Sequence, residues 1–325
     1  MDLSIIIVNH RGWKHLAKCL DSLCTFKGNR FTFEVIIIDN NSSDGRIDGF
    51  ISDYKDFIFI RNKINGGYAN GCNLGSKNSR GDFLLFLNPD TVASEEAVEK
   101  LLERAKANPG NFISSCSQVN EQNKVVMAFG LFPAIGTLTG TGRLIFKILK
   151  RKKLAEKTRS GDNVIYPDWV SGSVIMIKKE IFMDLGRFDE DFWMYYEDTD
   201  LCRRARDLGG EIAYYTDIRI YHIHGGSSRI DLKTTSLTKT EVIISKHLYI
   251  AKHMSGVKRS LIHLYLILNN LITGTFMALL GIILFMIPKI FGRILIYGKL
   301  IGYYSGVLKR KSWISPRSVK FIGNR

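Results

Sequence analysis

The sequence predicts an α/β protein with a mostly parallel, doubly wound β-sheet, followed by a basic and apolar helical region. Three observations lead to this prediction. Continuous apolar runs alternate with segments of helical periodicity over the first third of the 325 residues. Each apolar run ends in polar side chains. From residue 233 onward, acidic residues almost disappear while basic residues continue.

Four apolar runs have the composition of strands that are buried on both faces. They are LSIIIVN (3–9), FEVIIIDN (33–40), FIFIRN (57–62) and DFLLFLN (82–88). Such runs are typical of parallel strands that helices cover on both sides. We interpret the first run as a core strand rather than a signal peptide, because no basic leader precedes it.

Helical segments are expected between these strands. Apolar residues at helical spacing predict a helix over 13–23, and further helices are expected near 44–53 and 70–79. Ser94 is a good N-cap for a helix that runs to about Ala107. Strands joined by helical crossovers are typical of a doubly wound parallel sheet.

The carboxyl ends of the predicted strands all carry polar side chains. Asn9, Asp39 and Asn62 end the first three strands, and the fourth ends at Asn88-Pro89-Asp90. Ligands of open α/β sheets bind beyond this edge. We therefore expect the functional site there.

The site is not of the usual dinucleotide or phosphate-loop kind. The turn after the first strand, NHRGWKH, has one glycine where a G-x-G-x-x-G fingerprint needs three. A G-x-x-x-x-G-K-[ST] loop is also missing from the sequence. Any nucleotide must therefore be bound in another way.

The net charge of +15 is unevenly distributed. Residues 233–325 contain fifteen Lys or Arg and one acid, Glu241, whereas residues 1–232 contain 31 bases and 30 acids. A second basic segment, 143–159, has eight bases and one acid. Such patches serve nucleic acid, anionic lipid or solubility. The five cysteines are scattered without a C-x-x-C pair, which indicates reduced, mostly buried thiols.

Five motifs occur in an order that resembles a known enzyme family. They are SIIIVNHRG, VIIIDNNSSDG, NKINGGYANGCNLG, FLNPDT and YYEDTDLCRRARDLG. Together they resemble the family 2 inverting glycosyltransferases with the GT-A fold, and most closely their rhamnosyltransferase-like branch. The resemblance covers roughly the first 230 residues. It implies a nucleotide-sugar donor, with dTDP-rhamnose as the expected one.

The resemblance implies a set of donor-binding residues. Asp39 corresponds to an acid on the base or ribose, a task that suits a carboxylate because it accepts several hydrogen bonds. Asn9 and Asn62 would flank the base. Gly67 would allow the backbone to approach the ligand closely, although an ordinary turn explains it equally well. Trp169 would lie in a strand beneath the donor sugar.

The resemblance also implies a divalent cation, Mg²⁺ or Mn²⁺, at the end of the fourth strand. Asp90 matches the last acid of the family's Asp-x-Asp motif, whereas Asn88 replaces the first acid. Oxygen ligands suit such an ion, which offsets charge on the departing diphosphate. A histidine after the last strand is expected to meet the ion or the diphosphate. The spacing does not choose between His222 and His224.

The acidic run before the last strand contains the expected catalytic residues. The family makes the central acid, here Asp198, the base that takes the acceptor proton. Glu197 would bind donor or acceptor, and Asp200 would brace the helix. Helix N-termini also favour acids electrostatically, so capping explains one of the three equally well.

The C-terminal region is expected to associate with a membrane. Residues 260–288 contain no charged side chain over 29 residues, longer than the roughly 20 that a spanning helix needs. Segments 246–260 and 290–311 on either side are basic and apolar together. The positive-inside rule places both flanks on the cytoplasmic side. A re-entrant hairpin or in-plane helices would satisfy it better than a single crossing.

We therefore predict a glycosyltransferase domain over 1–232, with 143–159 as a basic insert, and a membrane-associating region over 233–325. The enzyme would transfer a sugar to a lipid-linked saccharide in bacterial cell-surface polysaccharide assembly, at the cytoplasmic face of the inner membrane. No nucleic-acid partner is expected. A processive polysaccharide synthase and a non-enzymatic protein that binds membrane or nucleic acid remain as alternatives. The synthases carry a Gln-x-x-Arg-Trp motif, which neither Gln118 nor Gln122 begins.

Overall fold

A computed structural model describes residues 1–133, 163–223, 231–283 and 288–322. The chain divides into a sheet unit, Met1–Asp189 with Glu197–Ser227, and a helical unit, Glu190–Tyr196 with Ser228–Arg325. The segment Glu190–Tyr196 lies within the predicted glycosyltransferase domain but groups with the helical unit. The predicted basic insert, 143–159, lies outside the described residues.

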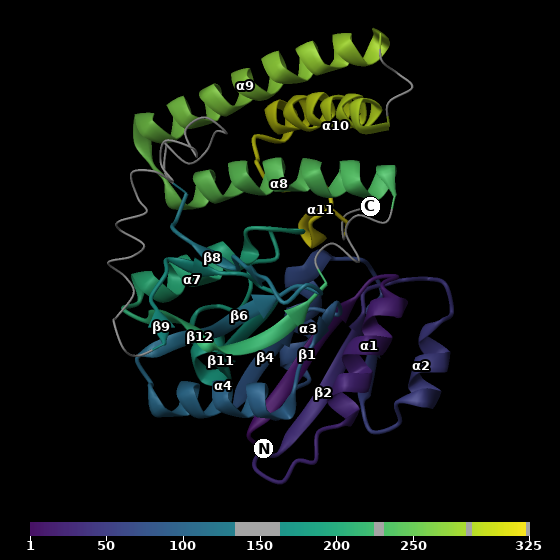
Figure 1. Cartoon of the computed structure of the whole chain (residues 1–325). Helices are drawn as coiled ribbons and strands as arrows, with labels where there is room; N and C mark the ends of the chain where they lie inside the picture. Colours follow the sequence, from purple (N-terminus) through teal and green to yellow (C-terminus); the bar gives the residue numbers. More distant parts are fainter. Residues whose placement is uncertain (134–162, 224–230, 284–287, 323–325) are drawn as a thin grey trace. The chain divides into compact units, whose positions relative to one another are not determined.

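The four predicted strands form one half of the main sheet (Figure 1). They are β1 (Leu3–Asn9), β2 (Phe33–Asp39), β3 (Ile58–Arg61) and β4 (Phe83–Leu87), in the order β3-β2-β1-β4. All three pairs are parallel, and Asn9 is in register with Asp39. Polar side chains at the strand ends therefore meet at one edge of the sheet.

The other half makes the sheet mixed. The strand β11 (Val174–Lys178) runs antiparallel to both β4 and β6 (Asn111–Val119), and β6 runs parallel to β12 (Glu211–His222). The two-residue strand β5 (Thr91–Val92) pairs antiparallel with the end of β12. The predicted α/β class is confirmed, with a change of strand direction at β11.

Short pairs complete the strand inventory of the described residues. They are β7 (Val125–Val126) on β6, β9 (Val164–Ile165) on β12, and β8 (Phe129–Gly130) with β10 (Trp169–Val170) as a separate two-stranded sheet.

Helices cover both faces of the sheet. On one face α1 (Trp13–Cys24), α2 (Ile47–Asp53) and α4 (Glu95–Ala107) pack against the odd-numbered side chains of β1. On the other face α3 (Gly67–Lys77), α6 (Lys179–Asp184) and α7 (Glu197–Asp207) pack against the even-numbered ones. The continuous apolar runs arise because every β1 residue is buried on one face or the other.

Two glycines allow α3 to lie directly on β1. A Cβ atom at Gly71 would stand 2.6 Å from Val8 Cγ1, and one at Gly75 would stand 2.4 Å from Ile6 Cγ2. Their spacing of four residues places both on one face of the helix. This close contact fixes α3, which starts at the edge of the sheet where the polar strand ends meet.

The helical unit contains three long helices that lie side by side (Figure 1). They are α8 (Leu232–His253), α9 (Gly256–Ile283) and α10 (Pro288–Arg310), followed by the short α11 (Val319–Ile322). Asp231 caps α8 by accepting a hydrogen bond from the Thr234 N–H at 2.7 Å. Within the described residues α9 is long and apolar enough to cross a membrane, over Gly256–Gly281 with a mean hydropathy of 1.5.

Candidate active site

Asp90 is fixed at the tip of the turn that follows β4. The Asn88 N–H donates to Ser173 O at 3.0 Å, and the Thr91 hydroxyl donates to Asn88 O at 2.7 Å. The Ile223 N–H donates to Asp90 O at 2.8 Å. Because β5 pairs with β12, Thr91 stands opposite His222. This pairing brings His222 to the carboxylate of Asp90.

The Asp90–His222 pair is buried and calls for a positive charge. His222 Nε2 lies 3.1 Å from Asp90 Oδ1, and both side chains are about 5% exposed. His222 Nδ1 lies 2.6 Å from Gln118 Oε1, an acceptor, so Nδ1 must carry a proton. In a neutral imidazole Nε2 would then present a lone pair to the carboxylate. A proton on Nε2 or a bound cation at this contact removes the repulsion.

The separation of these two side chains would fit a divalent cation that takes further ligands from a diphosphate and water. Two ligands about 2.1 Å from one octahedral ion, at right angles, stand about 3 Å apart, close to the observed separation. Within the described residues no group of three or more His, Cys, Asp or Glu side chains could hold a metal. Two protein ligands would suffice where substrate phosphates and water complete the coordination, as in many magnesium sites. His224 lies outside the described residues.

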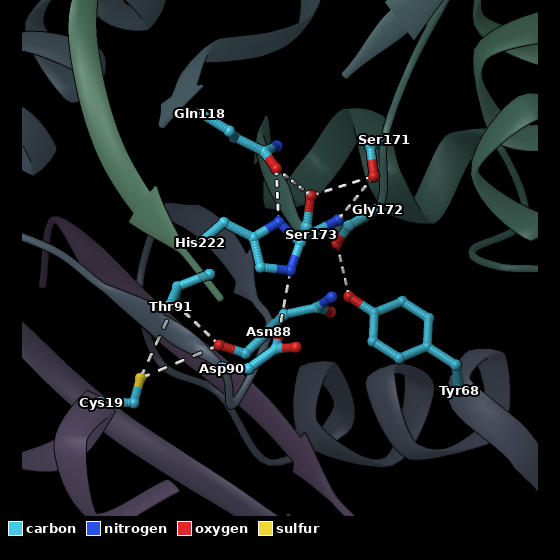
Figure 2. Close-up of polar contacts among 10 residues, drawn as sticks. All are labelled: Cys19, Tyr68, Asn88, Asp90, Thr91, Gln118, Ser171, Gly172, Ser173 and His222. Atoms are coloured by element: carbon cyan, nitrogen blue, oxygen red, sulfur yellow. Dashed lines mark hydrogen bonds and ion pairs between the residues drawn. The ribbon is translucent and has the colours of Figure 1, made fainter. Parts of the chain in front are cut away.

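The turn 171–173 links this pair to the predicted base. The Ser173 hydroxyl donates to Gln118 Oε1 at 2.9 Å (Figure 2). The Gly172 N–H donates to Asp198 Oδ2 at 2.9 Å. The Tyr68 hydroxyl donates to Gly172 O at 2.6 Å. One short turn thus holds the acid at the start of α7 and, through Gln118, the histidine beside Asp90.

Asp198 and Glu197 begin α7 and differ in their partners. Asp198 also accepts a bond from the Thr199 N–H at 2.6 Å. Burial raises the pKa of Asp198, and the hydrogen bonds from Gly172 and Thr199 offset part of this rise. Burial, and then the charge of Asp198, raise the pKa of Glu197 well above its usual value. Glu197 Oε2 is buried without a hydrogen-bond partner in the described part of the chain.

The predicted base-binding residues lie where β1 and β2 end. Asn9 accepts a hydrogen bond from the Gly12 N–H at 3.1 Å, and its Nδ2 has no partner among the described residues. Asp39 accepts a bond from the Ser42 N–H at 3.2 Å and another from the Ser42 hydroxyl. A buried amide N–H without a partner is unusual in a folded protein and suits a ligand carbonyl.

Asn62 and Gly67 take part in a network of hydrogen bonds among asparagine side chains. Asn62 Nδ2 donates to Asn40 Oδ1 at 2.8 Å and to Asn70 Oδ1 at 2.7 Å. Asn40 Nδ2 in turn donates to Gly67 O at 2.9 Å and to Asn65 Oδ1 at 3.1 Å. Gly67 has a φ of +88°. The network ties the ends of β2 and β3 to the start of α3.

The remaining predicted site residues have mainly backbone or structural contacts. The Trp169 indole N–H donates to Leu131 O at 3.0 Å, and the ring packs on Gly130. Asn88 is held through its backbone, by Ser173 and Thr91. Asp200 forms an ion pair with Arg204 at 2.7 Å, which fits its predicted role of bracing α7.

Residues 4–170 match the family described as Glycosyl transferase family 2. The chain belongs to this family. The matched segment includes Asp39 and Asp90, the two acids predicted at the ends of β2 and β4. Membership of this enzyme family favours a glycosyltransferase over the alternative of a non-enzymatic protein that binds membrane or nucleic acid.

Similar proteins come from archaea and bacteria. A low-salt glycan biosynthesis hexosyltransferase, Agl10 of Haloferax volcanii, is 28% identical over 63% of this chain and 62% of its own length. Rhamnosyltransferase WbbL of Escherichia coli is 23% identical over 67% and 82%. An N-acetylglucosaminyl-diphospho-decaprenol L-rhamnosyltransferase of Mycobacterium tuberculosis is 23% identical over 68% and 75%. The chain therefore spans less than two thirds of the archaeal relative. The predicted likeness to rhamnosyltransferases is confirmed.

Solved structures confirm the predicted GT-A fold. GalNAc-T7 with UDP, GalNAc and Mn²⁺ superposes with a TM-score of 0.55 at 15% identity, covering 77% of this chain and 51% of that one. Mannosyltransferase PcManGT from Pyrobaculum calidifontis, in complex with GDP-Man and Mn²⁺, gives 0.53 at 13% identity, covering 80% and 68%.

Three side chains of this candidate site were not predicted from the sequence. Gln118 and Ser173 connect His222 to the turn that holds Asp198, and Tyr68 secures that turn from α3. A signal for Gln118 exists in the sequence of β6, NFISSCSQV, which is too polar for a buried strand. Buried polar side chains need partners, so such a strand indicates a polar network.

Proposed function

We propose that the protein transfers a sugar, with inversion, from a nucleoside diphosphate donor to a lipid-linked saccharide. dTDP-rhamnose is the proposed donor, because two of the relatives named above are rhamnosyltransferases. One of these has a decaprenol-linked saccharide in its name. The observation that supports the proposal most strongly is the hydrogen-bonded connection from Asp90 and His222, through Gln118 and the turn 171–173, to Asp198.

The donor nucleotide would bind at the ends of β1 and β2. Asp39 offers carboxylate oxygens to ribose hydroxyls or a pyrimidine N–H. Asn9 Nδ2, which is buried without a partner in the described residues, offers a donor to a base carbonyl. The asparagine network around Asn62 orders the start of α3, so that the nucleotide meets a rigid edge.

Asp90 and His222 would hold a Mg²⁺ or Mn²⁺ ion, which offsets the charge that grows on the departing diphosphate. Gln118 fixes the imidazole by occupying Nδ1, so that Nε2 is directed at Asp90. Outer partners of this kind orient a ligating histidine and select its tautomer. The His222 ring would therefore already be oriented toward Asp90 before the donor and the ion bind.

Asp198 would take the proton of the acceptor hydroxyl at its carboxylate. Burial raises its pKa, which makes the carboxylate a better base than an exposed one. The Gly172 and Thr199 N–H groups keep it oriented. Glu197, neutral over a wider pH range because burial raises its pKa further, would donate a hydrogen bond to substrate rather than accept a proton.

The helical unit would hold the enzyme at the cytoplasmic face of the inner membrane, where a lipid-linked acceptor is present. Its apolar α9 and basic composition support this location. The processive synthase alternative is less favoured, because Gln118 is occupied by His222 and Ser173 and does not begin an acceptor-binding motif.

A donor panel tests this proposal. Purified full-length protein is incubated with Mn²⁺, a polyprenyl-diphosphate-linked saccharide and each of several nucleotide sugars. We expect acceptor-dependent release of nucleoside diphosphate from dTDP-rhamnose above the other donors, and its loss with chelator. Turnover of a different donor would overturn the choice of rhamnose. Absence of transfer from every donor would overturn the proposed activity.

A further inference from the structure

The helix α9 has an unusual distribution of polar and apolar side chains. The side chains that it turns inward include polar ones. His263 Nδ1 lies 2.9 Å from His247 Nδ1, and Asn270 Nδ2 donates to the Tyr304 hydroxyl at 2.9 Å. The Trp313 ring stacks on the His263 ring at 4.0 Å between centroids. A helix of a water-soluble protein normally directs such residues outward.

The opposite face of α9 is apolar and exposed. Its large exposed side chains are Val257, Leu261, Leu264, Tyr265, Leu268, Ile272, Phe276, Met277 and Leu279. Steps of three and four residues place these side chains along one face of the helix. Val257 is 75% and Ile272 is 67% exposed. A contiguous apolar face of this size marks an interaction surface.

We infer that this outer face of α9 lies in the plane of an anionic lipid surface, with the helix parallel to the bilayer. The inference rests on the proposed membrane location and specifies how the membrane is bound. Charge complementarity supports a lipid partner, because the region from residue 233 onward carries fifteen bases and one acid. Apolar contact and attraction to anionic headgroups act together in interfacial helices.

The neighbouring helices argue against a bilayer crossing. Tyr297 and Tyr304 of α10 bond to Thr275 and Asn270, so α10 follows α9 along much of its length. A perpendicular α9 would draw Arg293 and Lys299 of α10 into the hydrocarbon. Each charge at the bilayer centre costs about 2.5–3.5 kcal/mol on insertion scales. An in-plane helix avoids this cost.

Vesicle binding tests the inference with full-length protein. Leu268→Glu/Ile272→Glu changes the outer face, and Met183→Glu, at an exposed apolar position of the sheet unit, is the control. We expect the double variant to lose at least tenfold in affinity for phosphatidylglycerol vesicles and the control to match wild type. Release of nucleoside diphosphate with a short soluble acceptor should persist in all three, so a failure of the proposed function is seen separately. Unchanged vesicle binding would overturn the inference. A double variant that still binds lipid but no longer forms a dimer would also overturn it, because the face would then bind a second copy of the chain.

Labelling distinguishes an in-plane helix from a crossing one. In a Cys24→Ser background, single cysteines at Ser255, before α9, and at Phe291, an exposed position near the start of α10, are labelled with an impermeant maleimide after the protein binds preformed sealed vesicles. An in-plane helix predicts labelling of both positions from outside. Protection of position 291 alone would show a crossing and contradict the inference.

A second inference concerns Glu190–Tyr196, the segment of the helical unit that leads directly into α7. Asp191 is 5% exposed and forms ion pairs with Lys252 of α8 at 2.8 Å and Lys320 of α11 at 2.6 Å. Burial raises the pKa of Asp191, but the bonds from the two lysines outweigh it and hold the pKa below its usual value. Asp191 is the buried member of both pairs, whereas the Lys252 side chain is 29% and the Lys320 side chain 61% exposed. Removing a lysine leaves the buried carboxylate with less compensation for its burial.

Further contacts hold this segment to the same helices. The Ser318 hydroxyl donates to Glu190 O at 2.9 Å, and the Ser245 hydroxyl donates to Met194 O at 2.8 Å. The Arg317 guanidinium lies 5.6 Å from the centroid of the Trp193 ring. Trp193, which is 5% exposed, is therefore engaged within the helical unit.

The last two residues of the segment have a strained backbone. Tyr195 and Tyr196 have φ values of +70° and +69°, a region that bulky residues rarely adopt. Such residues cost about 1–3 kcal/mol each and persist only where the surroundings impose them. Tyr196 packs on Tyr249 of α8 with centroids 5.6 Å apart. Glu197 and Asp198 follow at once in the chain.

The geometry points to Lys252, Lys320 and Asp191 as positioning residues for Asp198. These three residues hold the segment Glu190–Tyr196, whose strained end leads directly into Glu197 and Asp198. The inference rests on the proposed role of Asp198 as the base.

Three variants of the full-length protein test this inference. Two of them are Lys320→Met and Lys320→Arg. The third, Lys311→Met, is the control, because Lys311 is exposed and follows α10. We expect Lys320→Met to lower kcat at least tenfold and to shift the pH profile of kcat, with the KM for donor unchanged. Lys320→Arg should restore most of the rate, and Lys311→Met should match wild type. An unchanged kcat and pH profile in Lys320→Met would overturn the inference. Inactivity of wild type would instead show that the proposed function is wrong.

Discussion

Gln118 is a single side chain that joins two parts of the candidate site. Its carbonyl accepts from His222 Nδ1 at 2.6 Å and from the Ser173 hydroxyl at 2.9 Å. Removing it leaves two buried polar groups without their partner and frees the imidazole to rotate. Each such group costs about 1–3 kcal/mol when it is left unpaired.

Gln118→Leu should therefore weaken binding of Mn²⁺ about 10–100-fold in the presence of donor nucleotide, as loss of an outer partner of a metal ligand typically does. Titration of Mn²⁺ by electron paramagnetic resonance measures this. Gln122→Leu, at the other glutamine and exposed, is the matched control. Equal affinities in the two variants would show that Gln118 does not orient a metal ligand.

The carboxylate of Asp90 lies beside His222, with Oδ1 3.1 Å from Nε2. Asp90→Asn keeps the shape of the side chain but removes the charge that would hold the ion. We expect metal-dependent release of nucleoside diphosphate to fall by at least 100-fold, while Asp53→Asn, at an exposed position at the end of α2, leaves it unchanged. A variant with wild-type rates at low Mn²⁺ concentration would place the ion elsewhere.

At the scale of single elements, the contact of α3 with β1 depends on the absence of side chains. Gly75→Ala would place a Cβ atom 2.4 Å from Ile6 Cγ2, closer than packed atoms approach. We expect a loss of about 1–3 kcal/mol in the free energy of unfolding, the usual cost of overpacking.

The matched control for α3 is Gly49→Ala in α2, where nothing lies within 4 Å of the added atom. Alanine favours helix over glycine by about 1 kcal/mol, so this variant should be at least as stable as wild type. Thermal unfolding of both variants measures the difference. Equal melting temperatures would show that α3 does not lie as close to β1 as described.

In α8, Glu241 is buried, and its Oε1 lies 3.6 Å from Nε of Arg317. Burial raises its pKa to about 7, against which hydrogen bonding from Ser315 and the charge of Arg317 act. Between the unfolded pKa and pH 7 the folded state binds the proton more tightly than the unfolded state. Stability is therefore greatest at acid pH and is lost as pH rises through 7.

Glu241→Gln should remove this dependence, which amounts to about 3 kcal/mol for a shift of this size. We expect the variant to be more stable than wild type at pH 8 and similar at pH 5, by thermal unfolding in detergent. Glu96→Gln, on the exposed face of α4, should change neither value. An unaltered pH dependence in Glu241→Gln would show that another group causes it.

At the scale of the whole molecule, a part of the structure could be predicted from the sequence where local pattern determines it, and could not where its partners lie far along the chain. The strands β1, β2 and β4 could be predicted because they are buried along continuous apolar runs. The strand β3 also has an apolar run, although it is only partly buried and not covered on both faces as predicted. Asp39 and Asp90 could be predicted because they stand at the ends of such runs. The strand β6 could not be recognised in this way, because Ser114, Ser117 and Gln118 are buried polar residues.

The segment Glu190–Tyr196 was assigned to the glycosyltransferase domain because it lies between two of that domain's motifs. Its partners, Ser245, Lys252 and Lys320, are more than 50 residues further along the chain. Local pattern carries no information about such partners. His222 was predicted together with His224, and only the pairing of β5 with β12 shows that His222 meets Asp90.

The central claim is that Asp198 takes the acceptor proton in a site organised around Asp90 and His222. The most direct test is the initial rate of sugar transfer to a polyprenyl-linked saccharide by Asp198→Asn, beside Glu197→Gln and wild type, with donor affinity measured separately. We predict that Asp198→Asn binds donor and Mn²⁺ as wild type does and transfers sugar about 10²–10⁴-fold more slowly, as expected for a lost general base. Wild-type transfer by Asp198→Asn, together with an inactive Glu197→Gln, would contradict this account.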